Sequence, residues 1–221
     1  MLTFYFDFIS PYAWLAWTQI HDLAARHGVE VDPAPILFAA LLNHHGQLGP
    51  AEIPAKRLFT FKDVVRKAAR LGQPLVPPPA HPFNPLLGLR LASLDLDPAP
   101  RRLLIDTLFR AVWADGPGIT DPVMVTALLQ EVGLDGEALV ARTADPEVKA
   151  RVKARTAEAI DREVFGVPTT MVGDEPFWGV ETLPDVELAL QGADPVTPEL
   201  MARWANLPAQ SHRPKSPQSQ R

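Results

Sequence analysis

The chain of 221 residues contains no cysteine. This absence excludes disulfide bonds, thiolate metal sites and cysteine nucleophiles, so any thiol chemistry must use a thiol from another molecule. Basic residues are also in the minority, with 21 Lys and Arg against 26 Asp and Glu and a formal net charge of -5. A nucleic-acid partner held by phosphate contacts is therefore not expected.

Long apolar runs are missing as well. No stretch approaches the roughly 18 consecutive apolar residues of a membrane span. The N-terminal segment MLTFYFDF carries no basic region ahead of its apolar run, unlike a signal peptide. We therefore expect a cytoplasmic protein without a membrane partner. Apolar residues still make up 47% of the chain, enough for the core of one domain with an insertion or of two small ones.

The N-terminal segments predict a βαβ unit. Residues 2–9, LTFYFDFI, are rich in aromatic residues and alternate with the period of two typical of a strand. Residues 12–27 have helical spacing and stop at Gly28, and residues 29–38, VEVDPAPILF, read as a second strand. A strand, a helix and a strand of these lengths favour a right-handed crossover.

Helical patterns dominate from about residue 57 to 160, interrupted by the proline-rich segment QPLVPPPAHPFNP. The segment 167–179, VPTTMVGDEPFWG, then predicts two short strands joined at Gly173-Asp174. TLPDVELALQG is expected to form the closing helix, and the polar tail 208–221 to be disordered.

The order β-α-β, helices, β-β-α predicts an α/β protein with a thioredoxin-like fold and an inserted all-helical domain. We expect residues 1–40 and 160–191 to form the discontinuous thioredoxin-like domain. Residues 41–159 would then supply a connecting loop and the helical insert.

Ser10 and Pro11 stand where the first strand meets the first helix. Taken by itself, this pair favours a structural role, with Ser10 capping the helix and Pro11 at its first position. A helix N-terminus also favours an anion, so the same hydroxyl is suited to stabilise a thiolate.

Four segments in order resemble the 2-hydroxychromene-2-carboxylate isomerases and the related kappa-class glutathione transferases, which have DsbA-like folds. They span residues 2 to about 191: FYFDFISPYAWLA, IPAKRLFTFKDVVRKAARLG, AVWADGPGITDPVMVTALLQEVGLD and FGVPTTMVGDEPFWG. The resemblance implies a homodimer that uses glutathione as its cofactor and acts on a small molecule.

The resemblance also implies a glutathione site built from separate segments. Ser10 would donate to the sulfur, with Pro11 and Tyr12 beside it. A cis Val167-Pro168 bond would present the Val167 backbone to the cysteinyl part of glutathione. The remaining contacts implied by the resemblance are Gln47, Lys56, Val180, Glu181 and Thr182.

Val180 and Glu181 depart from the pattern of this family. Relatives place a small polar residue and an aspartate there to hold the γ-glutamyl end. Val180 cannot donate a hydrogen bond from its side chain, so we expect weaker binding of glutathione.

Candidate substrate contacts are Asn43, His44 and Lys62, the last of which shares a helix face with Arg66. Asn43 and His44 are expected in a loop. His44 and His45 are expected to point apart, and no carboxylate has ligand spacing, so no metal site is predicted.

The function that the resemblance implies is glutathione-dependent cis-trans isomerisation of 2-hydroxychromene-2-carboxylate or a related aromatic pyruvate compound, in the catabolism of aromatic compounds. Two alternatives stay open. One is a kappa-like transferase that leaves glutathione attached to an electrophile. The other is a non-catalytic binding protein that kept the fold.

Overall fold

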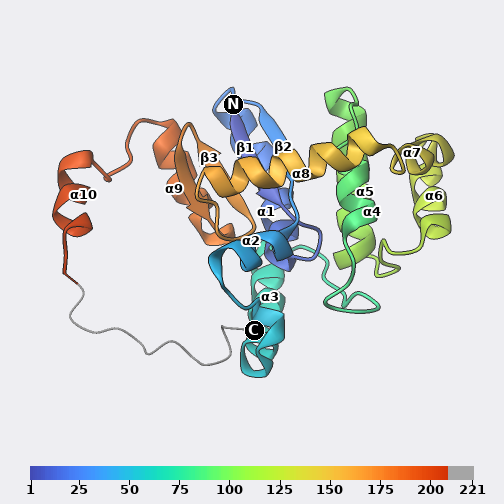
Figure 1. Ribbon diagram of the computed structural model, residues 1–221, viewed down its shortest axis with the longest axis horizontal. Helices are drawn as coiled ribbons and strands as arrows, with labels where there is room; N and C mark the ends of the chain where they lie inside the picture. The colour runs from blue at the N-terminus through green and yellow to red at the C-terminus, as the bar shows by residue number, and fades with distance from the viewer. Residues whose placement is uncertain (209–221) are drawn as a thin grey trace.

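The computed structural model describes residues 1–208, so the predicted disordered tail lies outside the described residues except for Pro208. A four-stranded sheet with the order β2-β1-β3-β4 forms its centre (Figure 1). β1 runs parallel to β2 and antiparallel to β3, and β3 pairs antiparallel with β4. The strands are β1 Leu2–Phe6, β2 Val31–Pro35, β3 Thr169–Val172 and β4 Glu175–Trp178.

Successive side chains of a strand point to opposite sides of the sheet. Apolar side chains of β1 therefore lie on both faces, and helices cover both. Phe4 and Phe6 of β1 pack against Trp17 and Phe109 on one side, with ring centroids 5.4 to 5.9 Å apart. Tyr5 belongs to a second buried cluster on the other side. The first side is covered by α1 Pro11–Arg26, α5 Pro98–Trp113 and α9 Leu183–Leu190, and the second by α2 Phe38–His45 and α8 Pro146–Asp161.

The inserted helices share a core with the sheet. Leu104 and Ile105 of α5 belong to the same buried cluster as Phe4. The other elements of this part are η1 Pro50–Glu52, α3 Pro54–Leu71, α4 Leu86–Ala92, α6 Pro122–Glu131 and α7 Gly136–Arg142. Within residues 1–208, no helix has the length and apolar character that a membrane crossing requires.

Two elements differ from the sequence prediction. The second strand ends at Pro35, and the segment expected to continue it turns into α2 at Phe38. Leu37 at the start of α2 provides no side-chain cap, and the Phe38 backbone N–H donates instead to Asp7, 3.0 Å away. Because this cap comes from a residue 31 positions earlier, no local signal marked the helix.

A further helix, α10 Pro198–Ala205, follows the helix that was expected to close the fold. It is capped by Thr197, whose side chain accepts from the Leu200 backbone N–H. None of its residues is buried, and it stands apart from the sheet and its helices (Figure 1). η2 Val180–Thr182 is a short 3-10 turn that leads into α9.

Candidate active site

Ser10 lies at the junction of β1 and α1 and is nearly buried, with 8% of its surface exposed. Its Oγ accepts a hydrogen bond from the Ala13 backbone N–H at 3.2 Å, as a helix cap does. The same hydroxyl donates to the carbonyl oxygen of Val167 at 3.3 Å. Capping the helix and stabilising an anion are therefore compatible roles for Ser10, because the cap leaves the hydroxyl at the positive end of a 16-residue helix.

The loop between α8 and β3 contains Val167 and lies beside Ser10. The Val167-Pro168 bond is cis, as predicted. The carbonyl oxygen of Pro168 accepts from the Gly179 backbone N–H at 2.9 Å, so the loop is joined to the end of β4. Ser10, Val167 and the start of η2 consequently belong to one corner of the molecule.

A chain of polar contacts leads from α1 to η2. The Tyr12 hydroxyl donates to Asp63 Oδ2 of α3 at 2.8 Å, and Asp63 pairs with Lys67 one turn later. Lys67 Nζ lies 2.6 Å from Glu181 Oε1 and 5.3 Å from the centre of the Tyr12 ring. Three segments that are remote in sequence thereby meet through four side chains.

Lys67 and Asp63 are both charged at neutral pH. Burial alone would lower the pKa of Lys67, but its hydrogen bonds to Asp63 and Glu181 outweigh burial and raise the pKa. Burial would likewise raise the pKa of Asp63, but the hydrogen bonds from Lys67 and Tyr12 lower it. Lys67 is therefore an ammonium and Asp63 a carboxylate.

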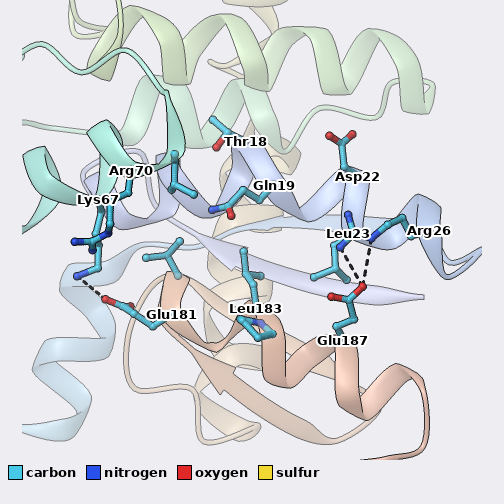
Figure 2. A pocket seen from close by; sticks show the side chains of 13 residues that line it. Thr18, Gln19, Asp22, Leu23, Arg26, Lys67, Arg70, Glu181, Leu183 and Glu187 are labelled. Atoms are coloured by element: carbon cyan, nitrogen blue, oxygen red, sulfur yellow. Dashed lines mark hydrogen bonds and ion pairs between the residues drawn. The ribbon is translucent and has the colours of Figure 1, made fainter.

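A groove of about 450 Å³ opens between α1, α3 and the η2–α9 segment, with Lys67 and Glu181 at one end (Figure 2). Arg26 and His27 both pair with Glu187 at the other end, at 3.1 and 3.0 Å. Ser10 is not among the lining residues. These are Thr18, Gln19, Asp22, Leu23, Arg26, Lys67, Arg70, Leu71, Val180, Glu181, Leu183, Pro184 and Glu187.

Several of the residues predicted for glutathione are brought together. Ser10 contacts Val167 directly, and Tyr12 is linked to Glu181 through Asp63 and Lys67. Pro11 is the first residue of α1 and is buried beside Ser10. Val180 is buried with 7% exposed, and the Thr182 hydroxyl donates to the Gly179 carbonyl oxygen at 2.9 Å.

The other predicted contacts are exposed at the surface. Lys56 and Lys62 are exposed on α3, and Gln47 follows the end of α2. Asn43 and His44 are also exposed, but they lie on α2, so the expectation of a loop was wrong at these two positions. The physical reason is the cap of α2 by Asp7, which only the fold provides.

The two adjacent histidines do not point apart as expected. Their ring centroids lie 4.9 Å apart in an edge-to-face arrangement at the end of α2. His45 Nε2 lies 3.1 Å from the Val164 carbonyl oxygen, in the loop before Val167. Among residues 1–208, no group of three or more His, Cys, Asp or Glu side chains is arranged to hold a metal ion.

Sequence reasoning missed Asp63 and Lys67. Their spacing of four residues on a predicted helix was a signal for an ion pair, but it could not reveal Glu181 as the third member. His81 was also missed. Its Nε2 lies 3.0 Å from the carbonyl oxygen of Ile9, next to Ser10, and burial lowers the pKa of this imidazole.

Comparison with known proteins agrees with this architecture. Residues 1–191 match the family model of the DsbA-like thioredoxin domain. A 2-hydroxychromene-2-carboxylate isomerase of Pseudomonas sp. (strain C18) is 30% identical over 196 residues, which cover 87% of this chain and 91% of that protein. A glutathione S-transferase kappa 1 of Caenorhabditis elegans is 24% identical over 220 residues, 93% of this chain and 97% of that protein.

A solved structure of a 2-hydroxychromene-2-carboxylate isomerase superimposes with a TM-score of 0.79 at 27% identity, covering 94% of this chain and 99% of the other. The resemblance thus extends over the sheet, the inserted helices and the order in which they occur. The chain belongs to the DsbA-like thioredoxin family and, within it, to the family of the 2-hydroxychromene-2-carboxylate isomerases.

Proposed function

We propose that this protein is a glutathione-dependent cis-trans isomerase of 2-hydroxychromene-2-carboxylate or a related aromatic pyruvate compound. The observation that carries the proposal is the Ser10 hydroxyl, held at the N-terminus of α1 and against Val167 in a chain without cysteine. Relatives named for this isomerisation and for glutathione transfer support it.

The residues at this corner fit glutathione. The Ser10 hydroxyl and the end of α1 suit a thiolate, and the Lys67–Glu181 pair at the end of the groove suits a zwitterionic group. Bound glutathione would supply a thiolate that adds reversibly to a conjugated carbon, so that the double bond becomes single, rotates and is restored on elimination.

The contribution of the protein is electrostatic and positional. A hydroxyl hydrogen bond together with the helix dipole would lower a thiol pKa of roughly 8.5 by about one or two units, which leaves much of the thiol ionised at neutral pH. Ser10 turns from the Val167 carbonyl to the sulfur in this scheme, while the Val167 backbone pairs with the cysteinyl backbone. Lys56 and Gln47 serve the glycyl end, and Asn43, His44 and Lys62 are the proposed substrate contacts.

We also propose that the protein acts in the cytoplasm, as a homodimer, in the catabolism of aromatic compounds. These finer statements rest on the resemblance to its family.

The first experiment follows the absorbance of 2-hydroxychromene-2-carboxylate with and without glutathione. We expect isomerisation that requires glutathione, a product of unchanged mass, and at least a tenfold loss of rate in Ser10→Ala because the thiolate loses its donor. Thr197→Ala is the matched control, since it also removes a hydroxyl cap, on the exposed α10.

Three results would contradict the proposal. A product heavier by one glutathione would indicate a transferase, and absence of any reaction together with absence of glutathione binding would indicate a binding protein. Equal rates in Ser10→Ala and wild type would leave Ser10 as a helix cap, whose loss costs only about 1 kcal/mol of stability.

A further inference from the structure

The turn that precedes Ser10 receives hydrogen bonds from side chains of the helical insert. Trp113, at the end of α5, donates from Nε1 to the carbonyl oxygen of Phe8 at 2.9 Å. His81 Nε2 lies 3.0 Å from the next carbonyl oxygen along the chain, that of Ile9. This carbonyl and the backbone nitrogen of Ser10 form one peptide group, so its orientation determines where the Ser10 side chain begins.

The contact with Ile9 identifies the protonated nitrogen of His81. A carbonyl oxygen can only accept, so Nε2 carries the hydrogen and Nδ1 of the neutral ring does not. Burial lowers the pKa of His81, and the charge of Arg57 acts in the same direction, against the hydrogen bond to Ile9. His81 is therefore a neutral imidazole at neutral pH, and its Nε2–H is a donor.

The other ring nitrogen of His81 shows that packing alone does not explain a histidine here. Within residues 1–208, Nδ1 is buried and has no hydrogen-bond partner. The ring lies against two aromatic side chains, with centroids 5.4 Å from Phe61 and 5.7 Å from Trp113. A phenylalanine would suit these neighbours without the free-energy cost of an unpaired nitrogen. The contribution peculiar to histidine is thus the Nε2–H donated to Ile9.

His81 is itself held by the first half of α3. The Arg57 Nη2 group donates to the backbone carbonyl oxygen of His81 at 3.0 Å. The Arg57 guanidinium also lies 5.8 Å from the centre of the Phe61 ring, one turn later on the same helix. His81 thereby connects α3 to the turn before Ser10, and the helix cap is not the sole restraint on this corner.

We propose that His81 is a positioning residue for the thiolate site, because its Nε2–H fixes the Ile9–Ser10 peptide and with it the direction of the Ser10 hydroxyl. The inference rests on the function proposed above. His81 acts through Ser10 and makes no contact with the sulfur. Without this donor the peptide can rotate, and the hydroxyl then stabilises the thiolate of glutathione less well, because such stabilisation depends on donors that are fixed in advance.

The test compares three substitutions of His81. Phenylalanine removes the donor and keeps a ring. Glutamine carries its amide nitrogen about where Nε2 lies, whereas the shorter asparagine carries it near Nδ1, out of reach of Ile9. For each variant we measure kcat and the KM for glutathione with 2-hydroxychromene-2-carboxylate. The pKa of bound glutathione is read from the ultraviolet absorbance of its thiolate.

We expect His81→Phe and His81→Asn to lower kcat at least about tenfold and to raise the pKa of the bound thiol by about one unit. The KM for glutathione should stay within about threefold of wild type, because the contacts that bind the peptide remain. His81→Gln should recover most of the rate and of the pKa shift. A purely structural role would not distinguish the two amides in this way.

The matched control is His21→Phe. His21 is also a histidine with a buried, unpartnered ring nitrogen within residues 1–208, and its ring lies edge-on to Trp17 with centroids 4.4 Å apart. It lies on α1 about three turns after Ser10. His21→Phe should keep the wild-type kcat and the wild-type pKa of bound glutathione.

The outcomes separate this inference from the proposed function. If wild type isomerises the substrate with glutathione and His81→Phe is equally fast, the role of His81 is overturned and the proposed function stands. Equal losses in His81→Gln and His81→Asn would overturn it as well, and they decide the matter if His81→Phe does not fold. If wild type shows no reaction that requires glutathione, both proposals fall.

Discussion

At the scale of single residues, Asp7 holds the local structure around Ser10, which follows three positions later. Its side chain is 1% exposed, and its two oxygens accept from the backbone N–H groups of Ile9 and Phe38 at 3.1 and 3.0 Å. It thus holds both the turn that leads to Ser10 and the start of α2. Burial raises the pKa of Asp7 to about 7, although the two hydrogen bonds oppose the shift.

This shift predicts a pH dependence of stability. Between an unfolded pKa of about 3.9 and the folded pKa of about 7, the folded protein holds a proton that the unfolded chain has released. Stability contributed by Asp7 is therefore present at low pH and lost as pH rises to 7, by about 2 to 4 kcal/mol. Above pH 7 the loss is complete.

Urea unfolding of wild type and Asp7→Asn at pH 5 and pH 8 measures this effect. We expect the free energy of unfolding of wild type to fall relative to that of the variant between these values, because asparagine has no proton to release. Parallel pH profiles of the two proteins would contradict the assigned titration of Asp7.

At the scale of elements, the close contact between α6 and α7 depends on a glycine. A Cβ atom on Gly136 would lie 2.3 Å from the carbonyl oxygen of Thr126 in α6. The backbone of an α-helix cannot retreat as a flexible side chain can. Gly136 is therefore required by packing, and its φ is not in the left-handed region.

We predict that Gly136→Ala lowers the free energy of unfolding by about 1 to 3 kcal/mol, as overpacking of a close contact does. Glu137→Ala is the neighbouring control on the exposed side of α7 and should stay within about 0.5 kcal/mol of wild type. Urea denaturation compares the three proteins, and a Gly136→Ala protein as stable as wild type would mean that α6 and α7 can move apart freely.

At the scale of the whole molecule, apolar side chains gather on the first half of α3. Leu58 and Phe59 are 58% and 63% exposed. A hollow of about 240 Å³ lies beside them, lined by Ala51, Pro54, Arg57, Leu58 and Phe61. Clustered exposed apolar residues of this kind mark interaction surfaces, and we take this face as the surface for the proposed homodimer.

Light scattering coupled to size-exclusion chromatography should give a mass twice the 24.2 kDa of one chain. The double variant Leu58→Asp, Phe59→Asp should shift it to the mass of one chain, because buried unpaired charges oppose association. Val123→Asp, at an α6 position that is 77% exposed, should remain a dimer. A single-chain mass for wild type would refute the homodimer.

Local signals in the sequence determined most of the secondary structure. The alternation of Phe4, Tyr5 and Phe6 predicted β1, and the Ser10-Pro11 start predicted α1, because strand period and helix capping depend on near neighbours. Gly72 ends α3 in the left-handed conformation that glycine favours, with a φ of 63°. The order of these elements was sufficient to predict the thioredoxin-like fold with its helical insert.

The tertiary structure decided which residues that are distant in sequence contact one another. Ser10 meets Val167 across 157 positions, and Tyr12 meets Asp63 across 51. Family resemblance suggested the first contact, whereas no feature of the sequence indicated that Lys67 would reach Glu181. The cap of α2 by Asp7 is another contact that the sequence did not indicate. Helix and strand propensities act over a few residues, but ion pairs and buried hydrogen bonds depend on distances that exist only after the chain has folded.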